Sequence, residues 1–276
     1  MTGGRFGWLV SYPKSGNTWL RLMLSSLLSG GESVDINAPA VRTGIATFSE
    51  MDEFLGIESS ELTDAEIADA RPALHAAFAA TNTEPLLLRK VHERFWHTPS
   101  GAAVFVPKLS AGAVYLIRDP RDVAISWSYH YGIGIDQVIE SMADDDIVLA
   151  RSETRASEQL PQPLGSWSGH ALSWLEQTEI PVLVIRYEDM LREALAPLTQ
   201  VATHLGITTT PALLDLAVET TRFEILSAQE KTHGFRERLS SATAPFFREG
   251  RSGGWRERLS AAQIDRIINR HKAVMA

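Results

Sequence analysis

Hydrophobic residues gather in four short runs along the 276-residue chain. Each run is almost uninterrupted and does not alternate with polar residues, a pattern typical of parallel strands buried on both faces. The four predicted strands are residues 7–12, 85–92, 113–118 and 181–187.

Between these runs, apolar residues recur at steps of three and four, which indicates amphipathic helices. The clearest stripe lies in residues 17–28. Thr63 with Glu66 has the pattern of a capping box and predicts a helix that runs to about residue 80, while Pro120 favours the start of a helix over 121–131. The remaining predicted helices are 165–177, 189–205, 211–220 and 260–273.

The alternation of strands and helices predicts the fold class. It favours a three-layer α/β architecture with a central parallel sheet. The chain has no internal repeat and no polar linker that would separate two domains. We therefore expect a single domain over residues 1–276.

Composition excludes several classes of function. Hydrophobic residues make up 44 % and charged residues 22 % of the chain, as in ordinary folded proteins. The 26 basic residues are outnumbered by 34 acidic ones, so a nucleic-acid partner is not expected. The absence of cysteine excludes disulfides, thiolate metal sites and a thiol nucleophile. No apolar run is long enough to span a membrane and no signal segment is visible, so we expect a cytoplasmic protein without a membrane partner.

Two segments carry unusual charge. Residues 50–69 contain eight acidic residues and no basic one, and residues 236–258 contain six arginines against three glutamates. The second segment is rich in glycine and poor in apolar residues, which predicts an irregular, positively charged loop before the last helix. Considered alone, in an arbitrary chain, a solvated surface connection is the better explanation.

The strongest chemical signal is the loop between the first strand and the first helix. Gly16 lets the backbone approach an anion, Lys14 adds a charge, and the helix N-terminus that follows presents unpaired N–H groups. The spacing is not that of a Walker motif, because the lysine precedes the glycine. The loop therefore predicts an anion-binding cradle; the alternative is a plain turn before a capped helix.

This loop resembles that of the sulfotransferases that use 3′-phosphoadenosine 5′-phosphosulfate (PAPS), the cytosolic type in particular. Their loop is Tyr-Pro-Lys-Ser-Gly-Thr-Thr-Trp, and residues 12–19 differ from it only at Asn17. The resemblance implies a P-loop-like sulfotransferase fold with Trp19 against the adenine. By the same resemblance, the residues that hold the 5′-phosphosulfate are Lys14, Ser15, Gly16, Asn17 and Thr18.

Further blocks match the family in the expected order. Arg118 and Ser126, eight residues apart, resemble its 3′-phosphate segment, and Lys90 with His92 matches its Lys-x-His pattern. Residues 246–255 resemble the segment that closes over the nucleotide. The remaining nucleotide-binding residues implied by the resemblance are Tyr187, Thr221, Phe223, Phe247, Arg248, Glu249 and Gly250.

The chain also departs from the family. Glu249 stands where the family has lysine, and we expect its carboxylate to point into solvent while Arg248 holds the 3′-phosphate. The family's dimer motif, Lys-x-x-x-Thr-Val, is not visible, so the choice between a monomer and a homodimer stays open.

The resemblance implies a sulfuryl transfer from PAPS to a hydroxyl of a small-molecule phenol or alcohol. His92 would be the general base, Lys14 and Lys90 would stabilise developing charge, adenosine 3′,5′-bisphosphate (PAP) would be the product, and no metal would be needed. One alternative is a nucleoside-triphosphate kinase with an aberrant loop, which would require magnesium ligands and a Walker lysine. The other is a non-catalytic nucleotide-binding module, which would not need Lys90 and His92.

Overall fold

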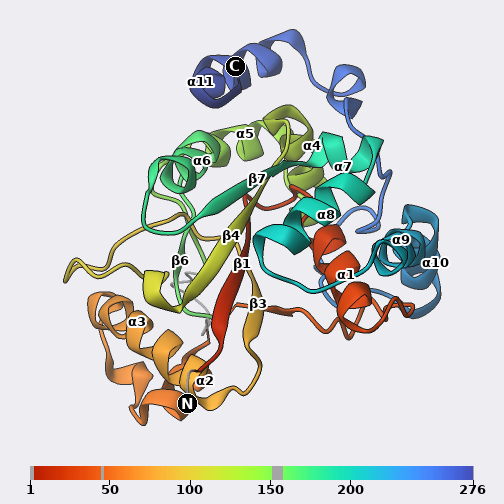
Figure 1. Ribbon diagram of the computed structural model, residues 1–276. Helices are drawn as coiled ribbons and strands as arrows, with labels where there is room; N and C mark the ends of the chain where they lie inside the picture. Colours follow the sequence, from red (N-terminus) through yellow and green to blue (C-terminus); the bar gives the residue numbers. More distant parts are fainter. Residues whose placement is uncertain (1–2, 45–46, 151–157, 276) are drawn as a thin grey trace.

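The computed structural model describes residues 3–44, 47–150 and 158–275. At its centre is a five-stranded sheet in the order β2-β3-β1-β4-β7, in which all neighbours are parallel (Figure 1). The strands are β1 (Arg5–Ser11), β2 (Arg42–Thr43), β3 (Leu86–Val91), β4 (Ser110–Ile117) and β7 (Val182–Arg186). The predicted α/β class and the four predicted strands are confirmed; the short β2 was not predicted.

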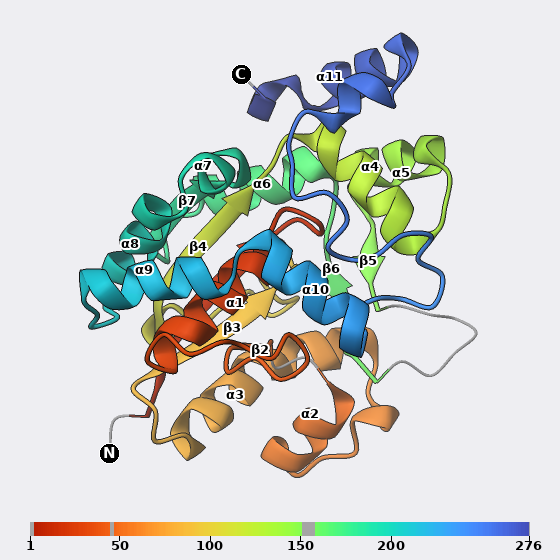
Figure 2. The same ribbon diagram turned by 90° about the vertical axis from the view of Figure 1, so that its right-hand side faces the viewer.

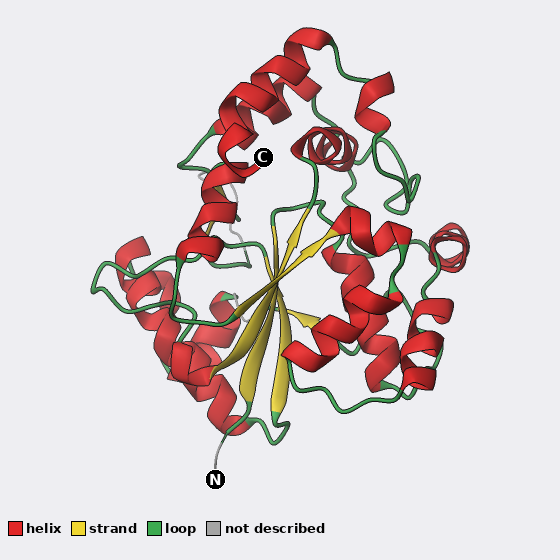
Figure 3. Ribbon diagram, turned by 45° about the horizontal axis from the view of Figure 1, so that its top comes forward, coloured by secondary structure: helices red, strands yellow, loops and turns green. Residues whose placement is uncertain are grey.

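Helices cover both faces of this sheet (Figure 3). Leu9 and Val114 point to one face, where they pack with α1 (Asn17–Leu28), α8 (Leu195–His204) and α9 (Pro211–Thr220). Phe6, Trp8 and Tyr115 point to the other, toward α3 (Asp64–Thr81) and α6 (Trp167–Glu176). Alternate residues of β1 thus enter two different cores, which explains why the run is apolar throughout.

The other elements surround this centre. The predicted capping box of α3 is present, with Thr63 and Glu66 hydrogen-bonded in both directions. A second capping box, between Thr47 and Glu50, opens α2. The remaining elements are α2 (Phe48–Leu55), α4 (Pro120–Tyr131), α5 (Ile135–Ala143), α7 (Tyr187–Arg192), α10 (Phe223–His233), α11 (Ala261–Met275), the short helices η1 (Ser59–Glu61), η2 (Pro107–Leu109) and η3 (Gly254–Glu257), and the hairpin strands β5 (Val148–Leu149) and β6 (Gln162–Pro163).

Two predictions were wrong. The helix expected over 189–205 is split into α7 and α8, and Pro197, which has no N–H to donate, lies in the first turn of α8. The Glu193 carboxylate accepts hydrogen bonds from the N–H groups of Leu195 (2.7 Å) and Ala196 (2.9 Å) at that new start. The run at β7 is not buried on both faces, since β7 is an edge strand and Val184 is 41 % exposed.

The carboxyl ends of the parallel strands meet at one edge of the sheet. His92 follows β3, Arg118 follows β4 and Tyr187 follows β7, while residues 12–16 connect β1 to α1. In α/β sheets of this kind, ligands bind outside these strand ends. The topology therefore assembles the predicted site residues from distant parts of the sequence.

The C-terminal third of the chain returns to this edge. Figure 2 shows α9 and α10 beside α1, and the segment that leaves α10 turns back toward α4 and α11. Asp122 of α4 anchors this segment, because its carboxylate accepts hydrogen bonds from the N–H groups of Gly253 (2.6 Å) and Trp255 (3.1 Å). Residues 234–253 contain no helix or strand, as predicted for most of the arginine-rich loop over 236–258, but the end of that loop forms the short helix η3.

A buried ion pair fixes the loop that follows β3. Arg71 of α3 and Glu93 form two hydrogen bonds, at 2.7 and 2.8 Å, and each side chain is 2 % exposed. The Glu93 backbone carbonyl also accepts a hydrogen bond from Trp174 Nε1 at 2.9 Å. Glu93 follows His92 directly, so this pair holds the backbone next to the predicted base.

We predict that Arg71→Ala lowers the free energy of unfolding by about 3 to 5 kcal/mol, because it leaves the Glu93 carboxylate buried without its partner. Urea unfolding followed by circular dichroism measures this change. The double variant Arg71→Met/Glu93→Leu should recover most of the loss. Equal losses in the single and double variants would show that the ion pair is not the cause.

Candidate functional site

A cavity of about 400 Å³ opens at the carboxyl ends of the strands. Of the predicted site residues, only Ser15 and Thr221 do not line it. Those that line it are Lys14, Gly16, Asn17, Thr18, Trp19, Lys90, His92, Arg118, Ser126, Tyr187, Phe223, Phe247, Arg248, Glu249 and Gly250. The structure thus brings together six segments that the sequence separates by up to 236 positions, from Lys14 to Gly250.

The loop after β1 has a strained backbone that suits anion binding. Lys14 and Gly16 both have positive φ, 71° and 98°. A Cβ at Gly16 would lie 2.5 Å from Cδ2 of Tyr187, so only glycine fits this position. Gly16 is also the N-cap of α1 and supplies no side-chain cap. The first-turn N–H groups of α1 therefore face the loop without a side-chain acceptor.

Three polar residues near the loop differ in their roles. The Oγ of buried Ser15 has no hydrogen-bond partner in the described part of the chain, although Ser15 does not line the cavity. The Asn17 amide instead ties the loop to β1, donating to Leu9 O (2.8 Å) and Ser11 Oγ (3.2 Å). Thr221 lies outside the cavity, where its carbonyl accepts a hydrogen bond from Trp19 Nε1 (3.0 Å).

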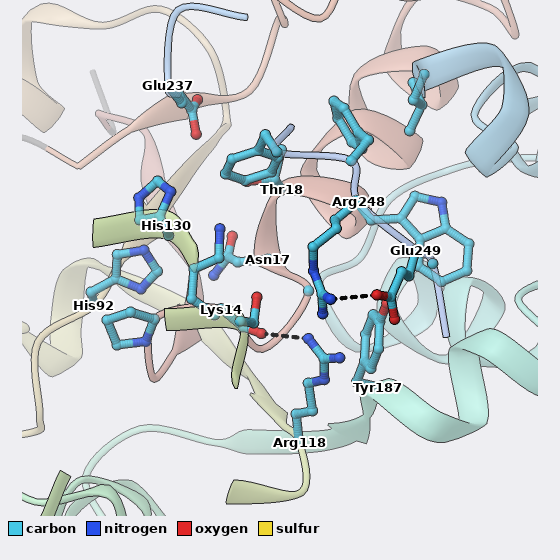
Figure 4. Close-up of a pocket in the computed structure, with 18 of the residues that line it drawn as sticks. Lys14, Asn17, Thr18, His92, Arg118, His130, Tyr187, Glu237, Arg248 and Glu249 are labelled. Carbon is cyan, nitrogen blue, oxygen red and sulfur yellow. Dashed lines mark hydrogen bonds and ion pairs between the residues drawn. The ribbon is translucent and has the colours of Figure 1, made fainter. Parts of the chain in front are cut away.

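Lys14 lies at the centre of the cavity (Figure 4). Its Nζ is 3.8 Å from the ring centroid of Phe246, and no carboxylate of the described residues forms an ion pair with it. Burial, together with the charges of Lys90 and Arg118, lowers the pKa of Lys14 to about 7. A bound anion would relieve this repulsion.

Arg118 lies in the cavity wall, on the side of Lys14 away from His92 (Figure 4). Its guanidinium donates a hydrogen bond to the Lys14 carbonyl (3.0 Å) and lies 4.3 Å above the ring of Tyr187. The Nε of Arg118 is buried without a partner among the described residues. Arg118 thus supports the loop with one nitrogen, donates to the Arg251 carbonyl with a second (3.3 Å), and keeps Nε as a donor for a ligand.

Lys90 has an acidic neighbour that sequence reasoning missed. Its Nζ lies 3.4 Å from Glu237 Oε2, and the other oxygen of Glu237 pairs with buried Arg21 of α1. Burial lowers the pKa of Lys90, and these two cations lower the pKa of Glu237 against the effect of its burial. Glu237 lies in the irregular segment, where no periodicity or motif identifies it.

His92 is oriented by the backbone. Its Nδ1 donates a hydrogen bond to Ser11 O (2.8 Å), which leaves Nε2 as the acceptor nitrogen. Burial and the charge of Lys90 lower the pKa of His92 well below its usual value, so the ring is neutral near pH 7. The His92 carbonyl accepts a hydrogen bond from His170 Nε2 (3.1 Å), and His170 Nδ1 accepts one from Tyr115 (2.8 Å).

The expectation that Glu249 points into solvent was wrong. Its carboxylate pairs with Arg248, with Arg251 (2.8 Å) and with Arg258 (2.7 Å). Crowded arginines repel one another unless a carboxylate lies between them, which explains an acidic residue here. Arg248 also lies 4.5 Å above the ring of Tyr129, within this cluster.

A second histidine in the cavity wall was also missed. His130 follows Ser126 by four positions on α4, so the two lie on the same helix face, and this spacing was a usable signal. Burial and the charges of Lys14 and Lys90 lower the pKa of His130 to about 4. His130 is therefore a neutral side chain beside His92 (Figure 4).

The described residues form neither a metal centre nor a membrane-spanning helix. No group of three or more histidine and carboxylate side chains there could hold a metal ion. None of the helices in that part of the chain is long and apolar enough to cross a membrane.

The comparisons with known proteins all indicate the same family. Residues 7–276 match the family model described as "Sulfotransferase domain". Sulfotransferase 2A6 of Rattus norvegicus is 24 % identical over 93 % of this chain and 80 % of its own, and sulfotransferase 1B1 of Mus musculus is 24 % identical over 97 % and 82 %.

Solved structures show the same fold. Mouse sulfotransferase SULT7A1, crystallised with PAP, aligns with a TM-score of 0.59 and 20 % identity over 97 % of this chain and 82 % of its own. A retinol dehydratase complex with androsterone and inactive cofactor PAP aligns with a TM-score of 0.61 and 17 % identity over 99 % and 81 %. The predicted sulfotransferase fold is confirmed.

We predict that Lys14 is the fastest-reacting lysine of the ligand-free protein toward cyanate at pH 8. With its pKa at about 7, about nine-tenths of Lys14 is neutral at that pH, against roughly 0.4 % of an ordinary lysine. Peptide mass spectrometry over pH 6–10 gives the rate for each lysine, with exposed Lys231 and Lys272 as internal controls. A Lys14 rate that follows the controls up to pH 10 would show that its pKa is not lowered.

Proposed function

The chain belongs to the sulfotransferase domain family, and from that premise we propose that it transfers a sulfuryl group from PAPS to a hydroxyl of a small phenol or alcohol. One observation carries the proposal. A strand-end cavity combines crowded cations beside an uncapped helix N-terminus with a neutral histidine whose acceptor nitrogen is free. The first feature suits a polyanionic donor, and the second suits a general base.

The residues around Lys14 fit the 5′ end of such a donor. Lys14, the unpartnered Ser15 Oγ and the first turn of α1, with Thr18, would hold the phosphosulfate. When bound, the donor supplies an activated sulfonate and a phosphate leaving group. Asn17 would act through its backbone, since its amide is bonded to β1.

The opposite end of the cavity fits the nucleotide. Arg118, Ser126 and Arg248 would hold the 3′-phosphate, for which arginine forks are well suited. The wall toward the adenine carries the aromatic side chains Trp19, Tyr187, Phe223 and Phe247. Gly250 lets the backbone pack closely against Phe223 in this wall, because a Cβ there would lie 2.6 Å from the ring of Phe223.

The acceptor hydroxyl would lose its proton to His92 Nε2. The bond from Nδ1 to Ser11 O selects the required tautomer, and the low pKa keeps the ring neutral before transfer. Lys90 would stabilise the growing negative charge. For that it must exchange Glu237 for the ligand, and the 3.4 Å separation is a weak enough contact to allow it.

The kinase alternative is less well supported by the side chains present. Glu237 and Glu249, two carboxylates that line the cavity, are both engaged by cations and would have to release them to bind magnesium. Transfer of labelled sulfonate from PAPS to a panel of phenols and alcohols tests the proposal directly. Thermal stabilisation by magnesium-ATP, with none by PAP, would favour the kinase instead.

We predict that His92→Ala lowers turnover by roughly two to four orders of magnitude while PAP affinity stays nearly intact, because only the general base is lost. Steady-state transfer and PAP titration measure the two quantities. His97→Ala, a partly exposed histidine bonded to Glu179 outside the cavity, is the matched control. Normal turnover of His92→Ala would remove His92 from the mechanism.

We predict that Arg248→Ala weakens PAP binding by roughly 10- to 100-fold, because it removes a charge-assisted pair with the 3′-phosphate. Affinity for adenosine 5′-phosphate, which has no 3′-phosphate, should change much less. The control is Arg192→Ala, whose side chain is 77 % exposed and outside the cavity. Equal losses for both nucleotides would place the 3′-phosphate elsewhere.

A further inference from the structure

The cavity has two ends, separated by Lys14. Figure 4 shows Arg118, Tyr187, Arg248 and Glu249 on one side of Lys14, and His92 with His130 on the other, toward Glu237. If the first side takes the nucleotide, as the proposed function requires, the second side receives the acceptor. The inference below concerns that second side and rests on the proposed function.

The acceptor side carries several polar groups. Besides His92, it has His130 and Glu237 (Figure 4), and Tyr131 of the cavity lining packs against His130. A plain hydrocarbon ring would cover these polar groups without offering them partners, which is unfavourable. An acceptor that fits must hydrogen-bond to this wall as well as to His92.

His130 is the group best placed to make that second contact. Its ring packs against Tyr131 and Phe246, with centroids at 5.1 and 5.7 Å, and neither ring nitrogen has a hydrogen-bond partner in the described part of the chain. Because the pKa of His130 is lowered to about 4, its ring is neutral and offers one donor and one acceptor. A hydroxyl group can use either.

Glu237 and its partners set the charge nearby. One oxygen of Glu237 pairs with Arg21 and the other with Lys90, so the carboxylate and the cations offset one another. Among the described residues on this side, the ring of His130 is the neutral polar group without a partner, and a hydroxyl is the neutral group that matches it.

We propose that His130 is a specificity-determining residue and that the acceptor carries a second hydroxyl next to the reacting one, as in a catechol. His92 takes the proton of one hydroxyl, and His130 hydrogen-bonds the other. Chemistry at the first hydroxyl does not involve His130, so its removal affects acceptor selection and not the transfer step itself.

The test compares three acceptors: catechol, its monomethyl ether and phenol. The kcat/KM of each is measured for the wild type and for His130→Phe, so that each acceptor is compared with itself and intrinsic reactivity cancels. We expect the substitution to lower kcat/KM for catechol by roughly five- to tenfold, the loss of one hydrogen bond at a partly buried site. Phenol should change by less than about twofold, with the ether in between.

Two variants separate this effect from a general disturbance. His130→Gln keeps a neutral donor and acceptor and should retain most of the preference for catechol. His233→Phe makes the same change at an exposed histidine outside the cavity and should leave all three acceptors unchanged.

Each other outcome overturns a defined part of the account. Equal losses for catechol and phenol, or a catechol preference that survives in His130→Phe, would exclude His130 as the specificity residue. Binding of PAP without transfer to any of the three acceptors would overturn the catechol class while leaving the proposed function intact. A protein that neither binds PAP nor transfers to any acceptor would contradict the proposed function itself.

Discussion

The arrangement of parallel strands is the constraint on which the rest of the structure depends. β3, β1, β4 and β7 are neighbours and run in the same direction, so the residues that follow them meet at one edge. This places Lys14, His92, Arg118 and Tyr187 around one cavity. The chain carries a net charge of -8, yet cationic side chains lie at or next to three of these strand ends. Local geometry, and not overall charge, therefore decides what this edge can bind.

Crowding of cations is the physical signature of the site. Burial disfavours the charge of Lys14 most, and the charges of Lys90 and Arg118 add to the effect. Two carboxylates offset part of this repulsion: Glu237 pairs with Lys90, and Glu249 pairs with Arg248. The proposed donor would bring anionic groups to Lys90 and to Arg248. In the ligand-free protein, Glu237 and Glu249 therefore pair with cations that the donor would bind.

The four long strands, most of the helices and the central loop were predictable because their signals are local, whereas α2, α5, α10 and β2 were not predicted. Apolar runs, the capping box at Thr63 and Pro120 at a helix start all act within a few residues of chain. The loop at Lys14 is likewise contiguous. The split between α7 and α8 carried a local signal too, in Pro197, but the apolar spacing on either side concealed it. The partners of Glu249 and the role of Glu237 could not be predicted, since they depend on how an irregular segment folds back onto α1, α4 and β3. His130 is an intermediate case. Its spacing from Ser126 indicated a shared helix face, but its surroundings in the fold could not be predicted.

The most direct test of the account is a calorimetric titration of the metal-free protein with PAP at pH 8, in two buffers of different ionisation enthalpy. The account predicts binding of one PAP per chain with micromolar or tighter affinity and net proton uptake, because an anion beside Lys14 raises a pKa that otherwise lies at about 7. In Lys14→Arg the proton uptake should disappear. No binding without a divalent metal, or binding with the same proton uptake in Lys14→Arg, would contradict the account.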